Sequence, residues 1–272
     1  MTDRYAAFDR LLFERPAPHV LRVTLNAPDR LNAVDAPFHL QLERVWAVID
    51  QDPEVRCTIV TGAGRAFCAG ADIAAASQAK PLDPGQTIAY TFSHATSLVR
   101  ALIDAKKPIV SAINGPAVGA GLALALLSDV PIAARHAKLV EGHLNLGAAA
   151  GDHAAIIWPL LCGMAKAKYY ILTNSAMTGE EAERNNLVAL AVDAGELQER
   201  ALEVARQIAR GAPTAIRMNK HVLNHWLRQN QPLFELSTMF EAANLASGES
   251  TEAIRAFMSK SEPDYTEESY FT

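Results

Sequence analysis

Two stretches decide the fold: "TGAGRAFCAGADI" (Thr61–Ile73) and "NGPAVGAGLALALLSDV" (Asn114–Val130). Each follows an apolar run typical of a buried strand, "CTIVTG" (Cys57–Gly62) or "PIVSAI" (Pro108–Ile113). Small residues let a ligand approach the main chain closely, and a helix N-terminus presents N–H groups without partners. If the two turns meet in space, they form an oxyanion hole with two donors. The alternative is that the small residues only allow tight packing between strand and helix.

The chain around these turns alternates between strand and helix patterns. This order predicts an α/β fold with layered helices and buried strands. The polar, proline-containing stretch Ser77–Gln86 is expected to be a loop. The further strands are predicted at Phe8–Phe13, His19–Leu25 and Val130–His136, and the helices at Ala36–Asp50, Ile88–Ala105 and Leu122–Leu127.

The character of the chain changes near Gly195, after which only helical patterns occur, with Gly and Pro at their joints. We therefore predict an α/β core over residues 1–195 and a helical C-terminal region over residues 196–272. The predicted helices of this region are Leu197–Arg210, Pro213–Leu227, Pro232–Ala246 and Thr251–Ser259.

Composition excludes several classes of protein. The 272 residues carry a net charge of −5 and no polybasic run, which argues against binding to nucleic acid or an anionic membrane. The cysteines Cys57, Cys68 and Cys162 lack CxxC spacing, so neither a disulfide framework nor a zinc knuckle is expected. The first residues lack a signal-peptide pattern, and the longest apolar run, Ala117–Leu127, is shorter than the roughly 20 residues of a membrane span. We expect a cytoplasmic protein.

Several catalytic motifs are absent from the chain. The dinucleotide-binding pattern GxGxxG fails at Phe67 in "GAGRAF" and at Leu124 in "GAGLAL". No GxxxxGK[ST], HExxH or GxSxG occurs. These absences argue against NAD enzymes, P-loop enzymes, zincins and serine hydrolases with a nucleophile elbow.

The segments "GRAFCAGADI" and "KPIVSAINGPAVGAGLALALLSDV" together resemble the crotonase (enoyl-CoA hydratase/isomerase) superfamily. Further similar segments are "NAPDRLNAV", "TGEEAERNNLV" and "AFMSKSEPDY", so the resemblance covers roughly Leu21 to Tyr265. It implies a crotonase-like spiral of repeated ββα units with a helical C-terminal trimerisation region. It also implies a homotrimer or a dimer of trimers.

The same resemblance implies an acyl-CoA thioester substrate, as in fatty acid metabolism, and no cofactor beyond the coenzyme A of that substrate. The enolate oxygen would be held by the N–H groups of Ala71 and Ala120. The family usually has glycine at the second of these positions; alanine keeps the N–H but disfavours a positive φ. Lys260 is equally well explained as a solvated surface charge. The residues that the resemblance places along the coenzyme are Arg30, Ala69, Asp72 and Lys260.

The chain departs from the family at both catalytic glutamates. Hydratases of the family use two glutamates to orient and deprotonate water, and the matching positions here are Ala123 and His143. The paired-glutamate mechanism therefore does not carry over. Asp152, in "AAGDHAA", is a candidate replacement, although an aspartate there is also a good helix N-cap.

His143 and Asp152 together suggest a catalytic pair. A carboxylate beside an imidazole fixes its tautomer and raises its basicity. The pair resembles the His/Asp pair of crotonase-family hydrolases that cleave β-diketones by a retro-Claisen reaction. An imidazole base has an intrinsic pKa near neutrality, so no large shift is required.

We therefore predict an enzyme of the enoyl-CoA hydratase/isomerase type, a lyase or isomerase, in which His143 moves the proton and Asp152 orients it. The alternatives are a C–C bond hydrolase of a β-diketone or a 3-oxoacyl-CoA, and a non-catalytic acyl-CoA-binding homologue.

Other polar residues are secondary candidates. His153 is adjacent to Asp152 in sequence and is expected to point elsewhere. Zinc bound by His143, Asp152 and His153 is disfavoured because no fourth ligand is evident, so no metal is expected. Glu141 is a weaker candidate acid, His94 either lines the acyl pocket or is exposed, and Glu180 or Glu181 is expected to cap a helix.

Overall fold

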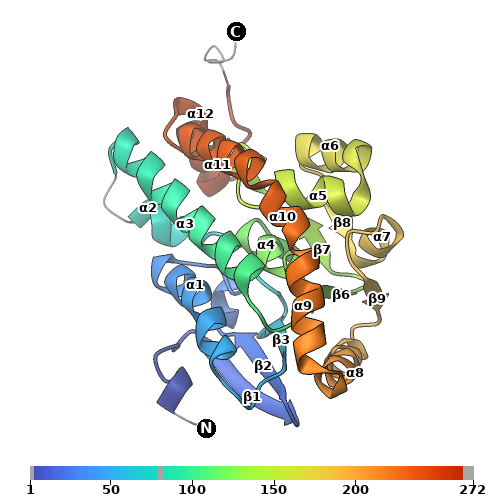
Figure 1. Cartoon of the computed structure of the whole chain (residues 1–272). Coiled ribbons are helices and arrows are strands. Elements are labelled where there is room, and N and C mark those ends of the chain that lie inside the picture. Colours follow the sequence, from blue (N-terminus) through green and yellow to red (C-terminus); the bar gives the residue numbers. More distant parts are fainter. Residues whose placement is uncertain (1–2, 79–81, 266–272) are drawn as a thin grey trace.

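The computed structural model describes residues 3–78 and 82–265 (Figure 1). A six-stranded sheet has the order β1-β2-β3-β4-β6-β9, and a three-stranded sheet has the order β5-β7-β8. The large sheet is parallel except for the β1–β2 pair. Its strands are β1 (Leu11–Ala17), β2 (Val20–Leu25), β3 (Cys57–Gly62), β4 (Ile109–Ile113), β6 (Val130–Ala134) and β9 (Leu190–Val192). The small sheet contains β5 (Ala117–Val118), β7 (Lys138–Val140) and β8 (Met177–Thr178).

Helices cover the sheets and form the C-terminal part of the chain. The first half contains α1 (Ala36–Asp50), α2 (Ile73–Gln78), α3 (Pro84–Asp104) and α4 (Ala120–Leu126). The middle contains α5 (Ala154–Cys162), α6 (Met164–Thr173) and α7 (Gly179–Arg184). The C-terminal helices are α8 (Leu197–Arg210), α9 (Pro213–Leu223), α10 (His225–Gln229), α11 (Gln231–Leu245) and α12 (Gly248–Ser259). Short 3₁₀ turns lie at Asp3–Tyr5, Pro28–Arg30 and His143–Leu146.

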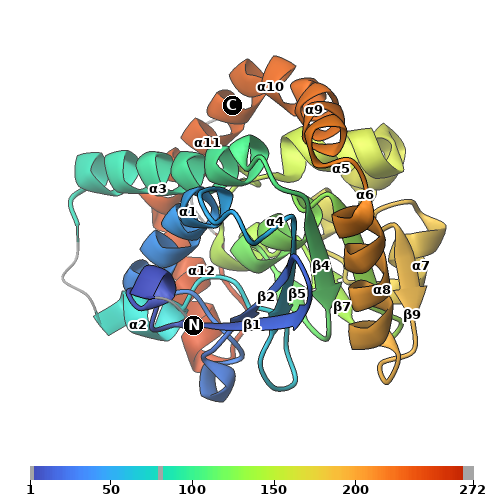
Figure 2. The same cartoon turned by 60° about the horizontal axis from the view of Figure 1, so that its bottom comes forward.

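The predicted α/β architecture is confirmed, and α1, β3 and α8 have the predicted bounds. Both β3 and β4 are buried along their whole length, as expected for central parallel strands. Helix α8 buries Leu197, Ala201 and Ala205 in the main core, and Figure 2 shows it lying along the sheet. None of the helices in the described residues is long and apolar enough to cross a membrane.

Several predicted boundaries were wrong, and three of them have consequences for the fold. Helix α3 begins at Pro84, inside the expected loop, because Asp83 and Gln86 form a capping box there; residues 79–81 of that loop lie outside the described residues. The predicted helix Pro213–Leu227 is divided into α9 and α10 at Asn224, whose side chain donates to the Ile103 carbonyl. The first strand begins at Leu11 rather than Phe8.

Candidate active site

The two small-residue turns meet in space, as the oxyanion-hole prediction requires. The Val118 N–H donates to the Cys68 carbonyl at 3.0 Å. A Cβ at Gly121 would lie 2.5 Å from that same Cys68 oxygen, and a Cβ at Gly70 would lie 2.8 Å from the Val118 oxygen. Side chains at these two positions would therefore force the turns apart, which explains why glycine occupies both.

Ala71 and Ala120 each present an N–H group with no main-chain acceptor in the described residues. Ala120 is the first residue of α4, where the N–H has no intrahelical partner. The positive φ that the turn requires is carried by the preceding Gly119, at 48°, and not by Ala120. Alanine at this position therefore keeps its donor without strain, and two N–H groups remain available for an oxyanion.

His143 lies next to this turn. Strand β7 ends at Val140, and Gly142, with a φ of 92°, turns the chain so that His143 begins a 3₁₀ turn. The Gly119 N–H donates to the Glu141 carbonyl at 3.0 Å, which joins the end of β7 to the start of α4. This contact brings the main chain two residues before His143 to the residue that precedes Ala120, and His143 itself is only 8 % exposed.

Three carboxyl groups surround the His143 imidazole. Glu141 binds it most closely, through the Nδ1 atom, and also accepts the His143 main-chain N–H at 3.1 Å. On the other side of the ring, Nε2 lies 3.3 Å from Glu241 Oε1 and 3.8 Å from Asp152 Oδ2. The structure thus brings His143 and Asp152 together as predicted, but Glu141 and Glu241 are the nearer partners.

The surroundings of His143 shift its pKa, although an imidazole base does not require a shift to act near neutral pH. Burial opposes its charged form, but the attraction of Asp152, Glu141 and Glu241, with the hydrogen bond that the ring donates to Glu141, outweighs burial. The pKa of His143 is therefore raised well above 6.5. Both ring nitrogens face carboxyl oxygens, an arrangement that suits the imidazolium, which donates from both. These surroundings favour the charged, proton-donating form of His143 over the free base.

The expectation that His153 points elsewhere was wrong. Its Nδ1 atom contacts Asp152 Oδ1, and its Nε2 atom lies 3.3 Å from the indole Nε1 of Trp158. Burial alone would raise the pKa of Asp152, but its interactions with the His153 and His143 rings, including the hydrogen bonds that His153 donates, lower it. Asp152 is therefore ionised at neutral pH. No side-chain capping bond is made at the N-terminus of α5, where His153 is the N-cap.

Glu241 is a further member of the cluster that the sequence motifs do not indicate. It lies on α11, is 7 % exposed, and its Oε2 atom is buried without a hydrogen-bond partner in the described part of the chain. Burial raises its pKa, and the repulsion of Asp152 and Glu141 adds to this, whereas His143 opposes it. Its spacing from the buried Phe234 and Thr238 on α11 was the available signal, because a glutamate on the buried face of a helix is unusual.

The predicted coenzyme-binding residues fall into two groups. Arg30 binds Asp72 at 2.6 Å and Asp35 at 2.9 Å, and the Ala69 N–H donates to the Leu31 carbonyl, so these residues form one continuous edge. Asp72 also caps α2 through the Ala75 N–H. Lys260 lies far along the chain, exposed after the end of α12, and no described contact joins it to this edge.

The secondary candidates have defined places. His94 donates from Nδ1 to the Tyr90 carbonyl and lies 5.5 Å, between ring centroids, from His39. Burial lowers the pKa of His39, although the hydrogen bond that its ring donates to Glu43 opposes this. The charge of Asp152 also acts on His39, so this pair of histidines borders the cluster. Glu181 forms a capping box with Thr178, which confirms the capping prediction.

The cluster also contains atoms that a metal ion could use, since ligand atoms of Glu141, Asp152 and His153 lie within 4.8 Å of one another. Each of these groups is already engaged, Glu141 by His143, and Asp152 and His153 by each other. A divalent ion would compete with the charged His143 ring for the same carboxylates. The donor set therefore suits a proton-transfer cluster better than a metal centre.

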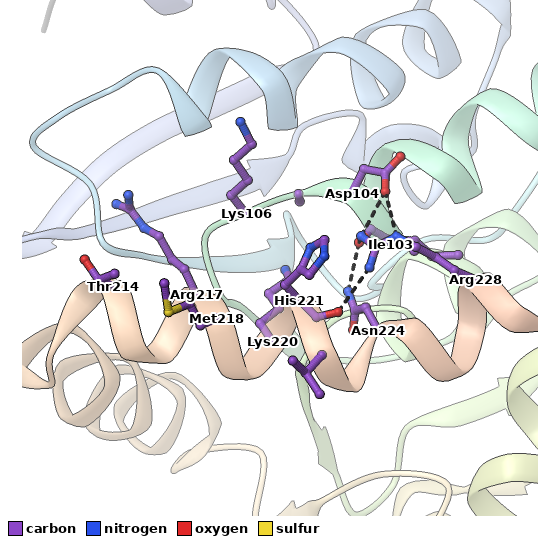
Figure 3. Close-up of a pocket in the computed structure, with 12 residues that line it drawn as sticks. Ile103, Asp104, Lys106, Thr214, Arg217, Met218, Lys220, His221, Asn224 and Arg228 are labelled. Carbon is purple, nitrogen blue, oxygen red and sulfur yellow. Dashed lines mark hydrogen bonds and ion pairs between the residues drawn. The ribbon is translucent and has the colours of Figure 1, made fainter.

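A groove of about 340 Å³ lies elsewhere, between the end of α3 and helices α9 and α10 (Figure 3). Its polar side chains hold these elements together: Asn224 donates to the Ile103 carbonyl at 2.9 Å, and Arg228 pairs with Asp104 at 2.9 Å. None of the cluster residues around His143 lines this groove. We therefore assign the candidate active site to the His143 cluster and not to the groove.

Comparison with known proteins agrees with this geometry. The family model "Enoyl-CoA hydratase/isomerase" matches residues 16–268. The chain is 32% identical over 250 residues to 1,2-epoxyphenylacetyl-CoA isomerase of Escherichia coli K12, covering 91% of this chain and 95% of that one. It is 34% identical over 203 residues to (E)-benzylidenesuccinyl-CoA hydratase of Thauera aromatica, covering 74% and 77%.

A solved enoyl-CoA hydratase/isomerase structure from Mycobacterium paratuberculosis superposes with a TM-score of 0.79 at 28% identity, covering 90% of this chain and 97% of that one. The fold, the meeting of the two turns and these similarities agree. The chain belongs to the enoyl-CoA hydratase/isomerase family, within the crotonase superfamily.

Proposed function

We propose that this enzyme transfers a proton on an acyl-CoA thioester, with His143 and Asp152 in place of the two glutamates of the family's hydratases. The N–H groups of Ala71 and Ala120 would hold the thioester oxygen as it becomes an enolate. One such donor contributes about 3–4 kcal/mol to transition-state stabilisation in comparable sites. The observation that carries the proposal is the buried His143 ring, which lies between carboxyl groups that favour its charged form.

Each group has a definite part in the proton transfer. The charged His143 delivers a proton to the enolate carbon, and the ionised Asp152, which faces Nε2, accepts the proton released by water or by the substrate. Glu141 holds the ring through Nδ1 and supports its charge. Both relatives named above act on CoA thioesters, one as an isomerase and one as a hydratase. Because of these two relatives, we propose hydration or double-bond isomerisation as the first candidate reaction.

The test of this proposal is turnover of crotonyl-CoA by wild type and two variants. Asp152→Asn and His143→Ala should each lower kcat by roughly a hundredfold or more, the usual size of acid–base effects. Near-normal rates in both variants would remove the support for this pair.

A second candidate function is hydrolysis of a C–C bond in a β-diketone or a 3-oxoacyl-CoA. Ala123, buried in α4, leaves no carboxylate at the position where hydratases of the family activate water. An imidazolium is suited to protonating the carbon that leaves in such a cleavage. Incubation with crotonyl-CoA and, separately, with a cyclic β-diketone distinguishes the two, and tight binding of CoA thioesters without turnover of either would favour a non-catalytic binding protein.

We further propose that Arg30, Ala69, Asp72 and Lys260 bind the coenzyme and that the chain forms a homotrimer or a dimer of trimers. Large apolar side chains are exposed on the helical C-terminal region, and a second copy would cover them. On α9 and α10 these are Met218, Val222, Leu223 and Trp226, each at least 60 % exposed. Sedimentation equilibrium tests the assembly, and a monomer at micromolar concentration would contradict it.

A further inference from the structure

The buried ring of His153 has a partner on each of its two nitrogens. Nδ1 contacts Asp152 Oδ1, and Nε2 lies 3.3 Å from the Trp158 indole nitrogen. His153 is completely buried, and Trp158 is completely buried on the first turns of the same helix, α5. Both nitrogens of the His153 ring and the indole nitrogen of Trp158 therefore have protein partners. These contacts decide which nitrogen of His153 carries a proton.

The chemistry of the indole determines the tautomer of His153. An indole N–H can only donate, so the nitrogen that it faces must accept and carries no proton. The single proton of a neutral imidazole is then on Nδ1, where it is donated to the Asp152 carboxylate. The indole thus selects the tautomer in which His153 is uncharged and serves Asp152 as a donor.

We propose that Trp158 and His153 form a positioning relay that keeps His153 neutral and fixes the Asp152 carboxylate toward His143. This inference rests on the proposed function, in which Asp152 faces the proton-transfer ring. With Oδ1 held by His153, the other oxygen, Oδ2, is the one that lies 3.8 Å from His143 Nε2. His153 and Trp158 touch no reacting atom and act only through Asp152.

The neutrality of His153 affects the charge balance of the cluster. The charged groups that face Asp152 and His143 are Glu141 beside β7 and Glu241 on α11, and His39 on α1 borders them. A positive charge on His153 would compete with His143 for the Asp152 carboxylate. His143 would then bind its own proton less tightly. A neutral donor orders Asp152 without this competition.

The first test reads the tautomer directly and needs no activity. In ¹⁵N-correlated spectra of the wild-type enzyme, the His153 ring should carry its proton on Nδ1 and none on Nε2. Comparison with the His153→Asn spectrum assigns its signals among the eight histidines. A proton found on Nε2 would overturn the relay whatever the enzyme's activity.

The second test removes the donor. Trp158→Phe removes the donor that faces Nε2 of His153. It should lower kcat about fivefold, which is the size of one ordinary hydrogen bond, and leave KM within twofold. The basic limb of its pH–rate profile should move to lower pH, because a charged His153 weakens proton retention by His143. Trp46→Phe is the matched control, since Trp46 is equally buried but its indole nitrogen has no hydrogen-bond partner in the described residues. Equal effects of the two variants on kcat and on the profile would show that only packing was lost.

The third test restores the donor. Asparagine can place an N–H near the position of Nδ1 and is also a good N-cap, so His153→Asn should keep most of the activity, whereas His153→Ala should lose about tenfold. Equal activity of the two variants would contradict the relay. If the tautomer is as proposed while Asp152→Asn has normal turnover, the relay stands and the proposed function fails.

Discussion

Glu241 Oε1 lies 3.3 Å from His143 Nε2, on the opposite side of the imidazole from Glu141. The two residues come from different parts of the chain, His143 from the turn after β7 and Glu241 from α11 in the helical C-terminal region. Docking of α11 therefore completes the environment of the candidate acid. The charge of His143 depends on this long-range contact as well as on its sequence neighbours.

Glu241→Gln should lower the pKa of His143, because one of the three attracting carboxyl groups is lost while the size of the side chain is kept. The basic limb of the pH–rate profile should shift to lower pH, with kcat reduced about tenfold. Glu235→Gln is the control on the same helix, since Glu235 is exposed and pairs with Arg100. An unchanged profile in Glu241→Gln would contradict the role of this contact.

Glu141→Gln should be more damaging to the acid function than Glu241→Gln. Glu141 is almost fully buried and accepts from both Nδ1 and the main-chain N–H of His143, so its loss removes the charge and the group that orients the ring. We expect kcat to fall by roughly a hundredfold and the melting temperature to fall as well. A loss smaller than that in Glu241→Gln would show that Nδ1 does not require this partner.

Ala120→Pro removes one oxyanion donor and little else. Position 120 is the first residue of α4, where proline is well tolerated, and its N–H serves no helix bond. We expect kcat to fall by about a hundred- to a thousandfold with the circular-dichroism spectrum unchanged. Ala120→Gly keeps the N–H and should stay close to wild type; equal losses in both variants would mean that the donor is not used.

Gly121→Ala should separate the two turns. Its Cβ would lie 2.5 Å from the Cys68 carbonyl oxygen, a main-chain atom that cannot move without shifting the Ala71 turn. We expect a loss of about 1–3 kcal/mol in the free energy of unfolding, measured with urea, together with lower turnover. Gly195→Ala is the control because a Cβ there meets nothing within 4 Å, and a similar loss in it would argue against the steric explanation.

The raised pKa of His143 predicts a pH dependence of stability. Its folded-state pKa lies above the ordinary 6.5, so its stabilising contribution is fully present below about pH 6.5 and is lost as pH rises through the folded-state pKa. The free energy of unfolding of His143→Gln should therefore differ most from wild type below pH 6.5 and approach it at alkaline pH. Urea titrations at several pH values measure this difference. A difference that grows with pH would contradict the raised pKa of His143.

Local sequence patterns predicted much of the fold and part of the site. Apolar runs predicted β3 and β4, and apolar residues at helical spacing predicted α1 and α8. The small residues in the turns after β3 and β4 indicated the positions of the oxyanion donors. The partners of the acid were harder to predict. Glu141 was considered only a weak candidate acid, His153 was expected to point away, and Glu241 was not considered.

The sequence alone determined that this chain folds as a crotonase-type α/β protein, and it indicated His143 and Asp152 as candidate site residues. These features depend on residue type and spacing, which the sequence contains. Only the tertiary structure decided that carboxyl groups surround the His143 ring and favour its charged form, and that His153 contacts Asp152. The reason is that the protonation of a buried group depends on the charges around it, and here α11 brings one of those charges from a distant part of the chain.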